Sequence, residues 1–283
     1  MKISNNKLST VKTFFLKELA SFEEAKLFFE ICCDSWLGMA KTDLLIDKDK
    51  ALSESEILKF FYGIKSLKNN EPVQYVVGET WFYDLRIGVK EGALIPRPET
   101  EELVDWIINS EKEAKFILDI GTGSGCIPLA LKNNLIKAKV SACDISGSAI
   151  EIAKENSKDL NLEVDFFKLD ILNDSTWKED KLDVIVSNPP YIPVQEKIRM
   201  NENVLDFEPD LALFVPDDQP LLFYIKIAEF AVLHLKPKGS LYFEIHEDFS
   251  SETIQMLKGK GFVDIEIKRD LQGKDRMVRA VLA

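Results

Sequence analysis

The spacing of apolar and polar residues changes near residue 70. Before that point apolar residues recur at helical intervals in two stretches, SFEEAKLFFEICCDSWLG and SESEILKFFYGIKSLKN. Each stretch begins with a serine that is followed three residues later by a glutamate, which is a capping-box pattern. The two pairs are Ser21 with Glu24 and Ser53 with Glu56. The pattern predicts a small N-terminal helical domain over residues 1–70.

The next stretch has the composition of a β-hairpin. Residues 75–95, YVVGETWFYDLRIGVKEGALI, are rich in β-branched and aromatic side chains, with glycine at turns. The sequence IPRPETEELVDWII follows, with Pro98 at a helix start and acidic residues in the first turn. We therefore expect a hairpin linker over residues 71–97.

From residue 115 onward, short apolar runs alternate with helical stretches. The runs are KFILDI, KVSACDI, LEVDFFKLDI, KLDVIVSN, GSLYFEI, FVDIEIK and MVRAVLA, and the helices are expected near 124–134, 147–158, 218–236 and 250–259. This alternation predicts an α/β domain over residues 98–283 with a doubly wound, Rossmann-like, mostly parallel sheet. Only RDLQGKD separates the last two runs, so we expect an antiparallel last strand.

Charge and composition narrow the classes of function. The net charge of −12 disfavours binding along extended nucleic-acid backbone, although a local basic groove would be compatible with it. The four cysteines form no CxxC pair, so we expect neither a zinc site nor disulfides, and a reducing cytoplasm fits. There is no run of 18 apolar residues, and the start lacks the apolar core of a signal peptide. We expect a cytoplasmic protein with no membrane partner.

The segment DIGTGSGCI lies between a predicted strand and a predicted helix. Gly121, Gly123 and Gly125 permit positive φ and close approach of a ligand to the backbone. The dinucleotide fingerprint would place its third glycine at Cys126, so the spacing counts against NAD. A tight turn without a ligand is the alternative.

Polar residues follow or close the first four apolar runs, namely Asp119, Asp144, Asp170 and Asn188. In open α/β sheets the ligand crevice lies outside the carboxyl ends of the strands. Asp144 can accept hydrogen bonds from both hydroxyls of a ribose, or it can be an acidic residue at a helix N-terminus. Asp170 can accept from an adenine amino group, or it can be an ordinary turn residue.

The segment IVSNPPYIP predicts a stiff strand exit, because proline fixes φ and has no N–H. Two acceptors, the Asn188 side-chain oxygen and the Pro189 carbonyl, can hold both hydrogens of a planar –NH₂ group. Pro190 stiffens that carbonyl, and Tyr191 offers a flat face. Asn188, Pro189 and Tyr191 are thus the candidate catalytic residues for a reaction at a conjugated nitrogen, and a purely rigid exit is the alternative.

The motif Asn188-Pro189-Pro190-Tyr191 matches methyltransferases that act on amino nitrogens of DNA adenine, ribosomal RNA guanine and protein glutamine. The G-x-G-x-G turn is similar to that of S-adenosylmethionine-dependent methyltransferases. The segments LIPRPETEELVDW, PVQYVVG, FYDLRIGV, FEPDLALF and GKDRMV resemble bacterial release factor glutamine methyltransferases. The resemblance spans nearly the whole chain and is specific from about residue 72.

The resemblance implies a class I methyltransferase fold, S-adenosylmethionine as cofactor, and the glutamine of the Gly-Gly-Gln motif in class I peptide chain release factors as substrate. The loop Gly121, Thr122, Gly123, Ser124 and Gly125 would hold the methionine part, with Asp144 on the ribose and Asp170 near the adenine. Asn188 to Tyr191 would hold the glutamine amide, with Asn188 also beside the cofactor. Ile171 stands where the family often has Trp, so we expect apolar contact there instead of stacking.

Two rival functions remain. The first is a nucleic-acid amino-group methyltransferase that uses the same four residues, against which the negative charge and the lack of a base-recognition domain argue. The second is a non-catalytic adenosylmethionine-binding module, against which the complete motif argues. We further expect a monomer without metal or nucleic acid, in which Arg97 pairs with Glu99 or Glu101.

Overall fold

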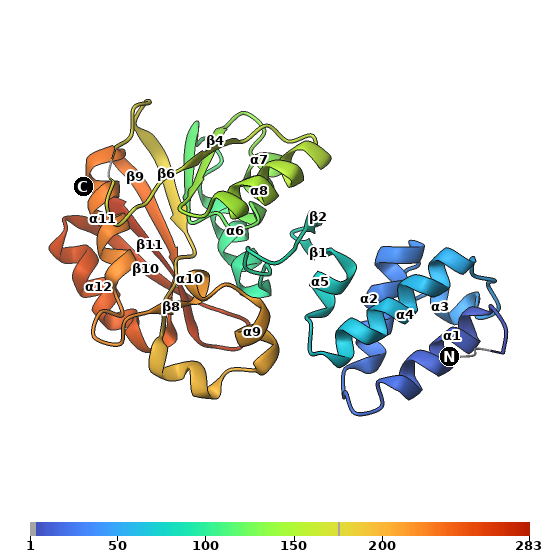
Figure 1. Ribbon diagram of the computed structural model, residues 1–283. Coiled ribbons are helices and arrows are strands. Elements are labelled where there is room, and N and C mark those ends of the chain that lie inside the picture. Colours follow the sequence, from blue (N-terminus) through green and yellow to red (C-terminus); the bar gives the residue numbers. More distant parts are fainter. Residues whose placement is uncertain (1–3, 175) are drawn as a thin grey trace. The chain divides into compact units, whose positions relative to one another are not determined.

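The computed structural model describes residues 4–174 and 176–283. By its internal contacts the chain divides into two compact units (Figure 1). One unit comprises Met1–Glu79 with Asn201–Phe207, and the other comprises Thr80–Met200 with Glu208–Ala283. Each unit has its own hydrophobic core.

The first unit is helical, as its apolar periodicity predicts. Its helices are α1 (Leu8–Glu18), α2 (Ala25–Leu37), α3 (Asp43–Ile46), α4 (Glu54–Lys68), α5 (Val73–Val77) and α9 (Glu202–Phe207). The core is built on three buried aromatic rings: the Phe15 and Phe29 centroids lie 5.4 Å apart, and those of Phe29 and Phe60 lie 5.5 Å apart. Such pairs add to the stabilisation that comes from burial alone. Cys32 and Cys33 are buried free thiols in the same core.

The two predicted capping boxes have different outcomes. At the start of α4, Ser53 Oγ accepts from the Glu56 N–H at 3.3 Å, and the Glu56 carboxylate accepts from the Ser53 N–H at 2.7 Å. The box predicted at Ser21 is wrong, because α2 begins at Ala25 without a side-chain cap. There the Phe22 carbonyl accepts from the Ala25 N–H at 3.2 Å, so a backbone turn takes the place of the serine.

Replacing Ser53 with alanine is expected to lower the free energy of unfolding of the first unit by about 1 kcal/mol, since the first turn of α4 loses its cap. Urea denaturation of the purified protein measures this loss. Ser21→Ala is the matched control and should leave the midpoint unchanged. An equal effect of both substitutions would contradict the difference between the two helix starts.

A β-hairpin begins the second unit. It joins β1 (Glu79–Phe82) to β2 (Leu85–Gly88) through two residues with positive φ, Tyr83 at 46° and Asp84 at 62°. Positive φ at both turn positions matches the right-handed twist of the flanking strands. The hairpin is shorter than predicted, because its first expected residues form α5. That helix follows Pro72 and ends at Gly78, whose φ is 83°.

The second unit contains a seven-stranded sheet with the order β10-β11-β9-β6-β3-β4-β5 in the described residues. Its strands are β3 (Phe116–Ile120), β4 (Lys139–Asp144), β5 (Asp165–Lys168), β6 (Leu182–Ser187), β9 (Leu235–Glu244), β10 (Phe262–Arg269) and β11 (Asp275–Leu282). The five strands from β9 to β5 are parallel, and β11 is antiparallel to both of its neighbours. The predicted fold class is confirmed, and the last strand of the chain lies inside the sheet instead of at its edge.

Helices connect and cover these strands (Figure 1). The main ones are α6 (Pro98–Ser110), α7 (Cys126–Asn134), α8 (Gly147–Asp159), α11 (Leu222–His234) and α12 (Ser250–Gly259). Helix α11 starts four residues later than predicted, because a turn in which the Pro216 carbonyl accepts from the Gln219 N–H precedes Pro220. The remaining elements are short: β7 (Ile192–Pro193), η1 (Val194–Arg199), α10 (Asp210–Leu213), β8 (Phe214–Val215) and η2 (Glu247–Phe249).

Candidate functional site

A pocket in the second unit lies at the carboxyl ends of the parallel strands. Its polar and loop lining comes from Gly121, Gly123, Asp144, Asp170, Asn188, Pro189 and Pro190. Its apolar lining includes Ile145, Leu169, Ile171, Phe223 and Ile227. The strand-end residues after β4, β5 and β6 therefore come together, as parallel topology requires. Asp119 does not reach the lining and is fully buried in β3.

The three glycines of the loop after β3 have two different roles. Their φ angles are 77°, 53° and 82° at Gly121, Gly123 and Gly125. A Cβ atom at Gly121 or Gly123 would meet nothing within 4 Å, whereas one at Gly125 would lie 2.9 Å from the Ala153 Cβ. The first two glycines thus leave open space at the pocket wall, and the third allows α7 to pack closely on α8.

The hydroxyl residues of this loop lie behind the pocket wall. Thr122 and Ser124 are 3% and 2% exposed, and neither lines the pocket. Within residues 4–174 and 176–283 their hydroxyl oxygens have no partner at hydrogen-bond geometry, and neither do the two carboxylate oxygens of Asp119. Burial raises the pKa of Asp119 to about 7, the nearby Thr122 hydroxyl lowers it in part, and the charge of Asp144 raises it to a smaller extent. A costly polar cluster therefore lies beneath the glycine loop.

Asp144 connects the loop to the next helix. Its Oδ2 accepts from the Gly123 N–H at 2.9 Å, and its Oδ1 accepts from the Ser146 N–H at 2.8 Å. Burial raises the pKa of Asp144, and these backbone hydrogen bonds act in the opposite direction. Ser146 caps α8 by accepting from the Ala149 N–H. The carboxylate is thus not needed as the cap, and its remaining lone pairs lie at the pocket.

Asp170 forms a local turn at the edge of the pocket. Its Oδ1 accepts from the Leu172 N–H at 3.0 Å, and its Oδ2 accepts from the Asn173 side-chain amide at 2.8 Å. Ile171 lies next to it in the lining, where Phe223 and Ile227 of α11 also contribute. The two α11 residues were not predicted, because their helical spacing does not distinguish them from neighbours that are in the core.

The segment after β6 holds its amide group in one orientation. Asn188 Nδ2 donates to Thr100 Oγ1 at 3.2 Å, and no described residue donates to Asn188 Oδ1 or to the Pro189 carbonyl. Two acceptors therefore remain available in residues that line the pocket. Tyr191 is half-buried outside the lining, and its hydroxyl donates to Glu244 Oε1 at 3.0 Å.

Two buried residues that the sequence analysis missed lie behind this segment. Thr100 in α6 and Glu244 at the end of β9 are 2% and 1% exposed. Thr100 Oγ1 donates to Glu244 Oε2 at 2.6 Å. Glu244 ends a parallel strand just as Asp144 does, and that shared position is the sequence signal that could have found it.

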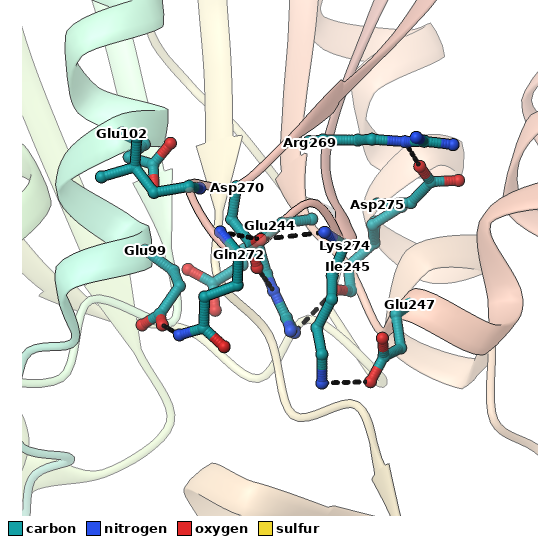
Figure 2. Close-up of polar contacts among 12 residues, drawn as sticks. Glu99, Glu102, Glu244, Ile245, Glu247, Arg269, Asp270, Gln272, Lys274 and Asp275 are labelled. Atoms are coloured by element: carbon teal, nitrogen blue, oxygen red, sulfur yellow. Dashed lines mark hydrogen bonds and ion pairs between the residues drawn. The ribbon is translucent and has the colours of Figure 1, made fainter.

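The turn between β10 and β11 contains Asp270, which Figure 2 shows among its neighbouring polar side chains. The Asp270 carboxylate accepts from the Gln272 and Lys274 N–H groups and from Arg276 Nε. Gln272 reaches Glu99 on α6, and Lys274 reaches Glu247 after β9, as Figure 2 shows. This turn therefore links α6 to the end of β9.

Arg97 pairs with neither of its expected partners. It forms an ion pair of 2.5 Å with Glu208, whose other oxygen accepts from the Ile95 N–H at 3.0 Å. Glu208 is only 5% exposed, and a carboxylate that is buried needs an ion pair or hydrogen bonds to offset its loss of solvation. Glu99 and Glu101 lie on the first turn of α6 instead. The segments LIPRPETEELVDW and FEPDLALF are thus joined in space.

Two findings concern metal-binding groups and membrane-spanning helices. Among the residues that the structure describes, no group of three or more His, Cys, Asp or Glu side chains could hold a metal ion. No helix in the described part of the chain is both long enough and apolar enough to cross a membrane.

Comparison with known proteins gives the family. The methyltransferase small domain family matches residues 100–206, and the PrmC N-terminal domain family matches residues 13–78. The release factor glutamine methyltransferase of Bacteroides thetaiotaomicron is 44% identical over 266 residues, covering 94% of this chain and 95% of the relative. That of Flavobacterium psychrophilum is 41% identical over 281 residues, covering 96% and 98%.

A solved structure shows the fold as well. The crystal structure of a methyltransferase from Pyrococcus furiosus superposes with a TM-score of 0.52 at 17% identity, covering 81% of this chain and 98% of that one. The relatives, the matched families and the strand-end pocket agree on an enzyme of the methyltransferase class. The chain belongs to the release factor glutamine methyltransferase family.

Proposed function

We propose that this protein methylates the side-chain amide nitrogen of the glutamine in the Gly-Gly-Gln motif of class I release factors. The activity for which the relatives are named supports the substrate class. The observation that carries the proposal is the fixed Asn188 amide, whose Nδ2 is bonded to Thr100 while its Oδ1 and the Pro189 carbonyl remain available. Two acceptors on a stiff segment suit a planar –NH₂ group.

The pocket fits S-adenosylmethionine as the cofactor. The open space over Gly121 and Gly123 admits a ligand at the loop, and Asp144 offers carboxylate oxygens in the same pocket. The apolar lining at Ile171 and Phe223 suits a flat base. When bound, S-adenosylmethionine supplies an electrophilic methyl group.

The residues of the chain then act by positioning. Asn188 Oδ1 and the Pro189 carbonyl each accept one hydrogen of the glutamine –NH₂ and thereby fix the direction of the nitrogen. The same two oxygens favour the nitrogen electrostatically as it becomes positive. The methyl–sulfur bond of the donor would break with both electrons on sulfur, which would leave a neutral thioether, and the methylated nitrogen would then lose one proton to water. Pro190 keeps the carbonyl rigid, because its ring restricts the preceding residue. Tyr191 anchors the end of the segment through Glu244.

The helical unit has a separate part in the proposal. The helices over residues 1–70 dock the release factor. The hairpin over 71–97 links these helices to the methyltransferase part over 98–283. The enzyme acts as a cytoplasmic monomer. Size-exclusion chromatography with light scattering tests the monomer. Binding of the release factor to the full chain with and without substitutions at exposed Tyr62, which is 70% exposed, tests the docking.

The function is tested by offering labelled S-adenosylmethionine with purified release factor, DNA and ribosomal RNA in separate reactions. Label on the release factor that disappears when its motif glutamine is replaced by glutamate is the expected result. Label on DNA or RNA would instead establish the rival nucleic-acid activity. Label on none of the three would overturn both.

Asp144→Ala is expected to raise the S-adenosylmethionine Kd by roughly tenfold to a hundredfold, because hydrogen bonds to a charged acceptor are lost. The kcat at saturating cofactor should fall much less. Calorimetry and turnover measure the two effects, with exposed Asp159→Ala as the control. An unchanged Kd with a lowered kcat would show that Asp144 has a different role.

A further inference from the structure

A buried carboxylate determines which way the Asn188 amide faces. Ionised Glu244 can only accept hydrogen bonds, and it accepts from Thr100 Oγ1 on one oxygen and from the Tyr191 hydroxyl on the other. A hydroxyl has one hydrogen, so a Thr100 that donates to Glu244 can only accept from Asn188. The Asn188 amide must then turn its Nδ2 toward Thr100, at 3.2 Å.

The consequence reaches the pocket. With Nδ2 committed to Thr100, the amide presents Oδ1, the acceptor, to the pocket. If the Thr100 hydroxyl were reversed, it would donate to the asparagine, and the amide could flip and present its –NH₂ group to the substrate. Two –NH₂ groups would then oppose each other, and the substrate nitrogen would lose one of its two acceptors.

We propose that Glu244 is a positioning residue for methyl transfer, acting through Thr100 on the Asn188 amide and directly on the Tyr191 hydroxyl. The inference rests on the proposed function, since it concerns how the acceptor pair is oriented. Glu244 and Thr100 are outside the pocket lining, so we expect them to act through Asn188 and Tyr191 and not by direct contact with a ligand.

The surroundings of Glu244 balance its charge. Burial raises the pKa of Glu244, and the hydrogen bonds from Thr100 and Tyr191, together with the charge of Arg276, oppose that shift. Arg276 Nε donates to Asp270 at 3.2 Å, and its Nη1 donates to the Ile245 carbonyl at 3.4 Å. The titratable groups that face Glu244 are Tyr191, Glu99 on α6, Cys126 on α7, Tyr224 on α11 and Arg276 on β11.

A pH dependence follows from this arrangement. Protonated Glu244 becomes a donor and can reverse the Thr100 hydroxyl, so turnover falls as the pH drops through the raised pKa of Glu244. The acid limb of the kcat profile is therefore expected above the usual glutamate range in the wild type, and it is lost in Glu244→Gln.

The experiment compares Thr100→Val, Glu244→Gln and the double variant with the wild type, using the purified full chain and a release factor. Thr100→Val keeps the shape of the side chain and removes the hydroxyl. We expect it to lower kcat by about tenfold to a hundredfold, as expected for a buried polar group that loses its partner. Glutamine can accept from only one of the two hydroxyls, so Glu244→Gln lowers kcat by about tenfold. Calorimetry should give an S-adenosylmethionine Kd within about twofold of wild type for both, because neither residue lines the pocket.

The double variant and the controls decide the mechanism. Because both substitutions break one relay, the double variant should lose less than the product of the two single losses. Thr100→Ser should restore most of the activity that Thr100→Val loses. Thr253→Val, a buried threonine on α12 that donates to Phe249, and Glu229→Gln on α11 should keep the wild-type kcat.

Two results would overturn the inference: wild-type kcat in Thr100→Val, or single losses that multiply in the double variant. If Glu244→Gln does not fold, the comparison of Thr100→Val with Thr100→Ser still tests the relay. If the wild type methylates a nucleic acid instead, the proposed function fails, and the same variants test the relay on that –NH₂ acceptor.

Discussion

Asn188→Ala is expected to lower the kcat of methyl transfer to a release factor by about a thousandfold, comparable to removing one group that stabilises a transition state. The S-adenosylmethionine Kd should change by less than about threefold, because the loop at Gly121 and Gly123 and the Asp144 carboxylate remain in place. Single-turnover transfer of labelled methyl groups measures the first quantity, and calorimetry measures the second.

The expected size follows from what the side chain does. Asn188 supplies one of only two acceptors for the substrate –NH₂, and without it the nitrogen can rotate away from the direction of attack. Asn134→Ala, at an exposed position near the end of α7, is the matched control and should leave turnover unchanged. A variant at Asn188 that turns over normally, or one that loses cofactor and turnover together, would contradict the assigned role.

Asp119→Asn is expected to stabilise the cofactor-free protein at pH 8 by up to about 4 kcal/mol, as the shift of its pKa from 3.8 to about 7 implies. In the described residues no group lies at hydrogen-bond geometry to this carboxylate, and the nearby Thr122 hydroxyl offsets only part of the rise in its pKa. A neutral amide of the same shape removes the charge without leaving a cavity.

The sign follows from proton linkage. The folded-state pKa of Asp119 is raised above its unfolded value, so the folded protein holds the proton more tightly. Wild-type stability therefore falls as the pH rises from about 4 to about 7, and it is level above that range. The stabilisation by Asp119→Asn should be small near pH 4 and largest above pH 7.

Urea denaturation of both proteins at pH 5 and pH 8 measures the difference. Exposed Asp165→Asn controls for the change in net charge and should give the same small effect at both pH values. If Asp119→Asn changes the free energy of unfolding equally at the two pH values, the ionised Asp119 carboxylate does not destabilise the wild type. A bound cationic cofactor should reduce the wild-type penalty, so the ligand should stabilise the wild type more than Asp119→Asn.

Local physics explains why much of the fold could be predicted from the sequence. Apolar residues that recur every 3.6 residues predict a helix, as in α8, and a short continuous apolar run predicts a strand, as in β6. Parallel topology then brings the residues after successive strands to one edge, which placed Asp144, Asp170 and Asn188 together. Glycine and proline carry their own backbone constraints, so the loop at Gly121 and the stiff segment at Pro189 were predicted directly.

Tertiary structure alone decided the partners of polar side chains. Ser21 and Ser53 have the same local pattern, yet only Ser53 caps a helix, because a backbone turn occupies the other helix start. Arg97 pairs with Glu208, far along the chain, and not with its neighbours. The relay from Glu244 through Thr100 to Asn188 joins the end of β9, helix α6 and the segment after β6. A threonine and a glutamate are individually ordinary, and only their burial at hydrogen-bond distance makes them determine which end of an amide faces the substrate.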